Sequence, residues 1–107
     1  MYVMYLMIFI TTSNLEEANR IAHELLKRRL AACVNIIPKV YSSFLWKNEL
    51  ESCEESLLMV KSKLDVFDDL VNVVKSLHSY SVPEIIAIPI KASYSQYLSW
   101  IDEVIGK

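Results

Sequence analysis

The sequence contains very little glycine. Its 107 residues include a single glycine, Gly106, next to the last residue. Loops that hold phosphate groups need glycines so that backbone amides can approach the ligand closely, and a nucleotide-binding loop of that kind is therefore excluded. Only three prolines occur, and no stretch has the composition of a flexible linker. We therefore expect residues 1–107 to form a single domain.

The sequence also has no excess of basic residues. Eleven lysines and arginines face thirteen acidic residues, which gives a formal net charge of −2. Proteins that bind nucleic acids through the phosphate backbone depend on clustered positive charge to neutralise it. No such cluster is present, so we expect no nucleic-acid partner.

No hydrophobic run is long enough to span a membrane. The longest, residues 1–10, is entirely apolar or aromatic but reaches only about half of the roughly 20 residues that a bilayer requires. It has neither the basic leading segment nor the small-residue cleavage site of a secretory signal. The two cysteines, Cys33 and Cys53, are then expected to be reduced thiols. These features predict a cytoplasmic protein with no membrane partner.

Motifs of the common enzyme classes are missing as well. The sequence has no Gly-x-Ser-x-Gly element, and no nucleophile stands beside an evident base. We expect neither a catalytic centre nor an organic cofactor.

Apolar residues, in contrast, are abundant. They make up 53% of the chain, above the usual range for a small soluble domain. A subunit interface is the simplest place for such a surplus. One set of aromatic residues lies at the expected hairpin and towards the last helix: Tyr41, Phe44, Trp46, Tyr80, Tyr94, Tyr97 and Trp100. A ligand-binding box is one interpretation, but packing between subunits is favoured because aromatic side chains dominate such contacts.

The first half of the chain predicts a strand, a helix and a hairpin. Residues 3–12 form a continuous apolar run, typical of a strand covered on both faces. Asn14 followed by Glu17 predicts the start of a helix that continues to about Leu30. Residues 32–46 are rich in β-formers, and Pro38 within them predicts a bulge or an edge. Residues 47–48, Lys-Asn, are typical of a two-residue turn.

The second half repeats the order with a strand, a helix and another strand. The return strand of the hairpin ends with residues 57–61, and a helix begins near Asp65 with apolar residues along one stripe. Residues 84–90 form a third buried run, with Pro89 indicating an edge, and an amphipathic helix closes the chain. The order is βαββαβ plus a C-terminal helix. It predicts an α+β fold of the ferredoxin-like kind, with an antiparallel sheet and the two main helices on one face.

Several short segments, in this order, resemble the CutA family of divalent-cation-tolerance proteins. They are residues 29–36 (RLAACVNI), 46–51 (WKNELE), 61–62 (KS), 78–86 (HSYSVPEII) and 97–101 (YLSWI). Asn48 stands where the family usually has glycine, and it can adopt the same left-handed backbone at modest cost. Ile10 and Leu77 stand where copper-binding members carry a second cysteine and a second histidine.

The resemblance implies a cytoplasmic homotrimer that confers tolerance to divalent cations and binds copper(II) or another divalent metal ion. On this basis His78, Cys33 and Glu84 are the candidate ligands, with His78 the principal one because neutral imidazole binds first-row divalent ions well. The structural alternatives stay open. His78 can instead bind a backbone carbonyl at the end of its helix, and a buried cysteine such as Cys33 often serves only as a small hydrophobe.

Two other functions compete on the same fold, because fold alone does not fix function. A trimeric sensor of small ligands, like the P-II nitrogen regulators, would need a long mobile loop between two strands, whereas the expected turn at Lys47 is short. An acylphosphatase-like enzyme would need an anion-binding loop with an arginine before the first helix. Residues 11–14, Thr-Thr-Ser-Asn, contain no arginine.

Overall fold

A computed structural model of the protein describes residues 4–106. Its elements follow the predicted order: β1 (Tyr5–Thr12), α1 (Leu15–Lys27), β2 (Cys33–Trp46), β3 (Glu49–Lys63), a 3-10 turn (Leu64–Val66), α2 (Phe67–Leu77), β4 (Ile85–Pro89) and α3 (Ser95–Ile105). The four strands form one antiparallel sheet in the order β2-β3-β1-β4. The predicted ferredoxin-like α+β fold with an additional C-terminal helix is confirmed. Within residues 4–106, no helix is long and apolar enough to cross a lipid bilayer.

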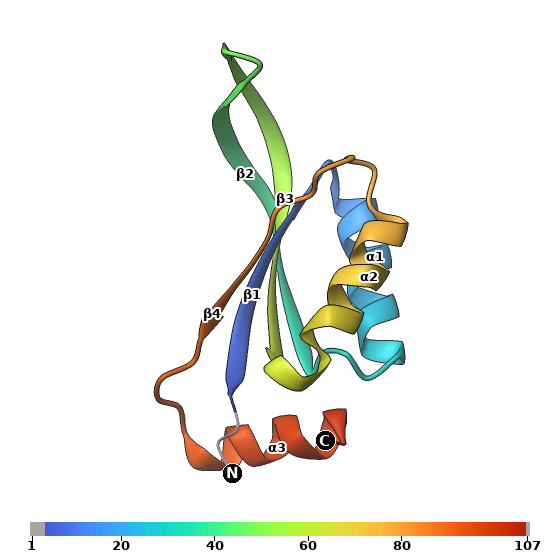
Figure 1. Ribbon diagram of the computed structural model, residues 1–107, viewed down its shortest axis with the longest axis vertical. Coiled ribbons are helices and arrows are strands. Elements are labelled where there is room, and N and C mark those ends of the chain that lie inside the picture. The colour runs from blue at the N-terminus through green and yellow to red at the C-terminus, as the bar shows by residue number, and fades with distance from the viewer. Residues whose placement is uncertain (1–3, 107) are drawn as a thin grey trace.

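Helices α1 and α2 pack side by side on one face of the sheet, whereas α3 lies across the end from which β1 begins (Figure 1). The hydrophobic core fills the space between the sheet and the two helices. Its fully buried members include Ile8, Ile10, Leu58 and Val60 from β1 and β3, and Ile21, Leu25, Leu70 and Val74 from α1 and α2. This core is the most completely packed part of the molecule.

Helix α1 begins where the sequence predicts and ends earlier. The side chain of Asn14 accepts a hydrogen bond from the Glu17 amide at 2.8 Å, and the Glu17 carboxylate accepts one from the Ser13 amide at 3.1 Å. Asn14 is therefore the predicted cap, but Glu17 reaches the amide of Ser13, one residue before the cap, and not that of Asn14 as in a standard capping box. The helix ends at Lys27 rather than at Leu30, because Arg29 adopts a left-handed backbone with φ of 60°. Leu30 then donates its amide back to Leu25 at 2.9 Å, which closes the last turn.

The strands are covered on one face only. Burial along β1 alternates strictly, with Leu6, Ile8 and Ile10 buried under the helices and the residues between them partly exposed. In β4, Ile86 and Ile88 are 52% and 47% exposed. The predictions that residues 3–12 are covered on both faces and that residues 84–90 are buried are therefore wrong for the single subunit. Residue 3 lies outside the described residues. Both helices pack on one face of the sheet, and nothing within residues 4–106 covers the opposite face.

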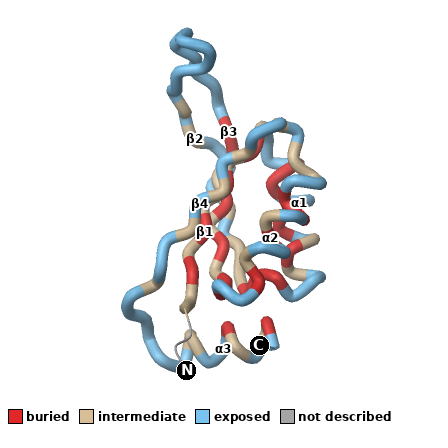
Figure 2. Tube along the Cα trace, viewed as in Figure 1, coloured by how far each residue is buried: buried red, intermediate tan, exposed pale blue. Residues whose placement is uncertain are grey.

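The β2–β3 hairpin extends well beyond the helices and is the most exposed part of the molecule (Figures 1 and 2). The pairing of β2 with β3 shifts between Ile37 and Val40, so the bulge predicted at Pro38 is confirmed. Lys47 and Asn48 form the predicted two-residue turn, with φ of 52° and 67°. Left-handed backbone at both positions gives the turn the twist that a tight hairpin needs.

Helix α3 is attached to the end of the sheet by a few polar contacts and two buried isoleucines, Ile101 and Ile105. The buried ammonium group of Lys63 pairs with Asp102 at 2.8 Å, and the Tyr5 hydroxyl donates to the same carboxylate at 2.8 Å. The Lys63 ammonium group, and next the Tyr5 hydroxyl, hold the pKa of Asp102 below its ordinary value. Arg29 donates to the carbonyl of Val104 at 3.1 Å, near the C-terminus of α3.

Candidate functional site

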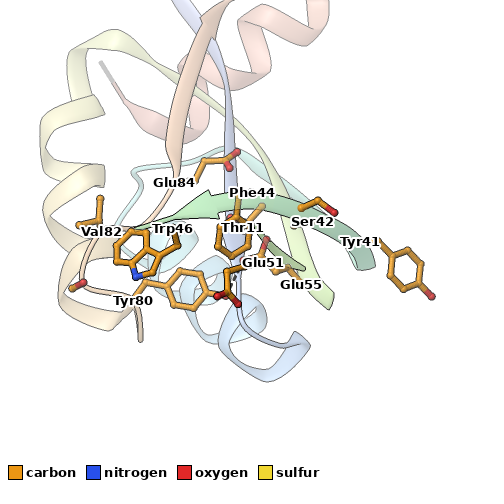
Figure 3. A pocket seen from close by; sticks show the side chains of 12 residues that line it. Thr11, Tyr41, Ser42, Phe44, Trp46, Glu51, Glu55, Tyr80, Val82 and Glu84 are labelled. Atoms are coloured by element: carbon orange, nitrogen blue, oxygen red, sulfur yellow. Dashed lines mark hydrogen bonds between the residues drawn. The ribbon is translucent and has the colours of Figure 1, made fainter. Parts of the chain in front are cut away.

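A cavity of about 850 Å³ opens between the hairpin and the loop that follows α2 (Figure 3). We call it the hairpin cavity. It is lined by Thr11 at the end of β1, by residues of β2 and β3, and by the loop before β4: Tyr41, Ser42, Ser43, Phe44, Trp46, Glu51, Glu55, Tyr80, Ser81, Val82 and Glu84. The cavity thus joins parts of the chain that are far apart in sequence.

Acidic and aromatic side chains give the hairpin cavity its character. Three lining residues, Glu51, Glu55 and Glu84, are carboxylic acids, and none of the lining residues is a lysine or an arginine. Glu55 is 8% exposed and accepts a hydrogen bond from the Tyr80 hydroxyl at 2.8 Å. Burial, and next this hydrogen bond to a carboxylate, raise the pKa of Tyr80 well above its ordinary value. Tyr80 therefore stays protonated and acts as a donor at neutral pH.

The loop that carries Tyr80 is held in place by His78. The Nε2 atom of His78 lies 2.7 Å from the carbonyl oxygen of Thr11, and its Nδ1 atom accepts a hydrogen bond from the Tyr80 amide at 3.0 Å. Because a carbonyl can only accept and an amide can only donate, the proton of the ring is assigned to Nε2. His78 thus binds a backbone carbonyl, as its structural interpretation expects, but the carbonyl is that of Thr11 in β1 and not one at the end of its own helix.

Glu17 anchors the same loop from the start of α1. Its side chain is buried, and besides the capping contact with Ser13 it accepts hydrogen bonds from the Ser79 amide at 2.7 Å and the Ser79 hydroxyl at 3.2 Å. Burial acts to raise the pKa of Glu17, but the hydrogen bonds from Ser13 and Ser79 outweigh it, so the pKa lies below the ordinary value. The carboxylate thus fixes one wall of the hairpin cavity while remaining outside its lining.

The structure does not bring the three predicted metal ligands together. Glu84 is exposed and lines the hairpin cavity, whereas both ring nitrogens of His78 are engaged by backbone groups behind it. Cys33 lies at the start of β2, opposite Lys61 and near Tyr97 at the end of the sheet that faces α3. Among residues 4–106, no three histidine, cysteine or acidic side chains are grouped so that they could hold a metal ion. That these residues bind metal stays a prediction.

Sequence reasoning did not find the connections that build the hairpin cavity. The spacing of Asn14 and Glu17 indicated only a helix cap, and nothing in it pointed to Ser79. Likewise, no local pattern linked Glu55 with Tyr80, because the two residues meet only after the hairpin has packed beside the loop.

Comparison with known proteins gives one consistent result. A family model described as CutA1 divalent ion tolerance protein matches residues 6–104. The divalent-cation tolerance protein CutA of Archaeoglobus fulgidus is 44% identical over 95% of this chain and 99% of its own length. Its Thermus thermophilus counterpart is 43% identical over 92% of this chain and 96% of its own length. The chloroplastic protein CutA 1 of Oryza sativa is 38% identical over 90% of this chain, which spans 54% of that longer relative.

The solved structures agree with the sequence matches. The structure of the Archaeoglobus fulgidus protein superposes with a TM-score of 0.92 at 42% identity and covers 94% of this chain and 98% of that one. The structure of CutA1 from Oryza sativa gives a TM-score of 0.92 at 36% identity, over 95% of this chain and 94% of that one.

Proposed function

Since the chain belongs to the CutA1 divalent ion tolerance family, we propose that it confers tolerance to divalent cations by binding them as a homotrimer. The observation that carries the proposal is the family match over residues 6–104, nearly the whole chain. The family is described by cation tolerance and not by a reaction, so we propose binding rather than catalysis.

The uncovered face of the sheet supports assembly. Phe9 lies opposite Ile86 in β4 and Met59 in β3, and Met7 lies opposite Ile88. Opposed residues point to the same face, so these side chains form one apolar band, which we call the open face. A contiguous exposed apolar band of this kind is typical of a surface that another subunit covers. We propose three subunits in the assembly on the basis of the family resemblance.

The mouth of the hairpin cavity is the place that we propose for the cation. Glu84 lines the cavity and directly precedes β4, whose Ile86 and Ile88 belong to the open face. A carboxylate there would lie next to the proposed subunit contact, where a neighbouring subunit can supply further ligands. One subunit alone does not offer a complete ligand set among its described residues, and His78 could bind a metal only after losing one of its two hydrogen bonds.

Native mass spectrometry with and without copper(II) and zinc(II) tests both parts of this proposal. We expect a trimer that takes up divalent ions, with uptake reduced in Glu84→Gln. A monomer at micromolar concentration would contradict the assembly, and a trimer without uptake would contradict direct binding.

Matched variants of histidine and cysteine test which of the predicted ligands bind the metal ion. His78→Ala is compared with His23→Ala, since His23 is exposed on α1, and Cys33→Ser with Cys53→Ser. Binding through imidazole should weaken below about pH 6.5, whereas binding through carboxylates alone should persist to about pH 4. Uptake that is equal in wild type and His78→Ala would make His78 a purely structural residue.

We propose a cytoplasmic location, although the solved Archaeoglobus fulgidus relative is described as periplasmic. Cell fractionation followed by immunoblotting decides between the two locations.

The competing function, a P-II-like sensor, is less well supported. The β2–β3 connection is the two-residue turn at Lys47 and Asn48 and not a long loop.

A further inference from the structure

We propose that the hairpin cavity binds a small organic cation, a primary ammonium or guanidinium group carried on a flat or aliphatic body. This ligand differs in kind from a metal ion, so the inference goes beyond the proposed function and does not depend on metal binding. It rests on three features of the cavity: its charge, the surroundings of Glu55 and its aromatic walls.

The charge of the lining favours a cation. Glu51, Glu55 and Glu84 all line the cavity, and no lysine or arginine does. The ion pair between Lys39 and Glu54, at 3.7 Å, involves two residues outside the lining. A concave surface with carboxylates and no built-in counter-charge attracts positively charged ligands and disfavours anionic ones.

Glu55 provides the specific contact. Its side chain is more than nine-tenths buried, and its Oε2 atom accepts the hydrogen bond from Tyr80. Within residues 4–106, its second oxygen, Oε1, has no hydrogen-bond partner. Oε1 keeps some contact with solvent, so it is accessible from the cavity and can accept a charge-assisted hydrogen bond, the strongest kind, from a ligand. An ammonium or guanidinium N–H supplies both the donor and the charge.

The aromatic walls favour an organic cation at the buried Glu55, whereas the divalent ion is proposed at the exposed Glu84. Phe44 and Trp46 are 43% and 51% exposed and line the cavity together with Tyr80. Figure 3 shows Trp46 and Tyr80 on the same side of the cavity, whereas the ring of Tyr41 points away. Aromatic faces attract organic cations and pack against their apolar parts, whereas metal ions such as Mg²⁺ and Ca²⁺ need several oxygen ligands around them.

The size of the cavity agrees with this ligand class. Its volume of about 850 Å³ falls within the range of small-molecule sites, about 300–1,000 Å³. A cation with a ring or a short chain can place its charged group at Glu55 and its apolar body against Trp46.

Three related probes test the inference on the full chain: phenethylammonium, 2-phenylethanol and phenylacetate, which share an apolar body and differ in charge. The chain has two tryptophans, so Trp100→Phe leaves Trp46 as the single fluorescent indole. We expect phenethylammonium to change its fluorescence and to bind at least about tenfold more tightly than the alcohol. Phenylacetate should not bind. Equal binding of the ammonium and the alcohol, or no binding of the ammonium, would overturn the proposal.

A matched pair of variants on β3 locates the charged contact. Glu55→Gln keeps an oxygen that can accept from Tyr80 but removes the charge, and we expect affinity for phenethylammonium to fall about tenfold. Glu54→Gln removes the neighbouring exposed carboxylate, which lies outside the lining, and should leave affinity unchanged. Unchanged binding in Glu55→Gln, measured by calorimetry, would place the probe elsewhere and reject the assignment.

A second variant keeps the test decisive if Glu55→Gln does not fold. Trp46 is half-exposed, so Trp46→Leu should preserve the fold while removing the aromatic face. We expect weaker binding of phenethylammonium by calorimetry and an unchanged circular dichroism spectrum. Binding that is as tight as in wild type would contradict the proposed position of the ligand.

Discussion

The two ends of the long strands β2 and β3 have opposite surroundings. Near Val60 the sheet lies under α1 and α2, where the inward side chains of β3 are fully buried and Val34 and Ile36 of β2 are partly buried. Near Leu45 and Leu50 the same two strands leave the helices, and these leucines are 72% and 77% exposed. Both ends have apolar side chains at strand spacing. Apolar content alone thus shows that a surface will be covered, but not whether the chain's own helices or another molecule covers it.

Truncation of one leucine at each end gives the sharpest test of this difference. Leu58→Ala removes a fully buried side chain, and we expect the free energy of unfolding to fall by about 2–5 kcal/mol at every protein concentration. Leu50→Ala should cost less than about 0.5 kcal/mol when the subunits are dissociated. Urea denaturation at several protein concentrations measures both.

Any larger effect of Leu50→Ala should appear only at high protein concentration, because only contacts between subunits depend on concentration. A large loss that is independent of concentration would mean that the hairpin is stabilised within its own subunit, and the contrast between the two ends would disappear.

A charge on the open face should break assembly and leave the core intact. In Ile88→Asp, each subunit loses the burial of an isoleucine, about 1.5–3 kcal/mol per site, and must place a carboxylate in an apolar contact. We expect sedimentation equilibrium to show smaller species while the circular dichroism spectrum stays that of a folded domain. Ile88→Leu preserves the apolar contact and is the control. A trimer that persists in Ile88→Asp would show that β4 lies outside the interface.

Acid should loosen the attachment of α3 before it disturbs the core. The lowered pKa of Asp102 means that its stabilising effect is complete above its ordinary pKa, about 3.9, and is lost as pH falls through the lower folded value. Asp102→Asn should cost about 1–2 kcal/mol at neutral pH, since the carboxylate is partly exposed, and should make stability less dependent on pH below about 4.

Hydrogen exchange of the α3 amides, followed by mass spectrometry, measures this effect. Faster exchange confined to α3 is expected in Asp102→Asn. Exchange that accelerates equally in β1 and β3 would show that α3 unfolds only together with the core.

The smallest effect is expected at the tip of the hairpin. Asn48 has φ of 67°, which glycine adopts without strain. Asn48→Gly should change stability by about 0.5 kcal/mol or less, whereas Asn48→Val should destabilise the turn by about 1–2 kcal/mol. Thermal unfolding compares the two. Equal Tm values would mean that the turn relaxes at no cost.

The parts of the fold that depend on residues close together in the sequence were predictable. Asn14 and Glu17 marked the start of α1, Pro38 marked the bulge, and residues 47–48 marked the turn, because each acts on its own stretch of backbone. The end of α1 was placed too late, since a left-handed Arg29 has no signal as clear as that of a glycine.

The features that depend on long-range contacts were not predictable. Continuous apolar runs in β1 and β4 look the same whether a helix or a partner covers their second face. His78 was placed correctly at the end of α2, but its contact with Thr11 comes from the other end of the chain. The candidate site was recognised only in part, through Glu84, because the hairpin cavity forms where segments that are distant in sequence meet.

The position of β1 in the middle of the sheet has a consequence for biosynthesis. Ile8 pairs with Val60 on one side and with Ala87 on the other, so β1 receives its second partner only after α1, β2, β3 and α2 have all been synthesised. At about 5–20 residues per second, an apolar segment then waits for several seconds without its neighbours. Non-local pairing of this kind also slows folding. Nascent chains stalled before β4 should therefore be better substrates for chaperones than the released protein.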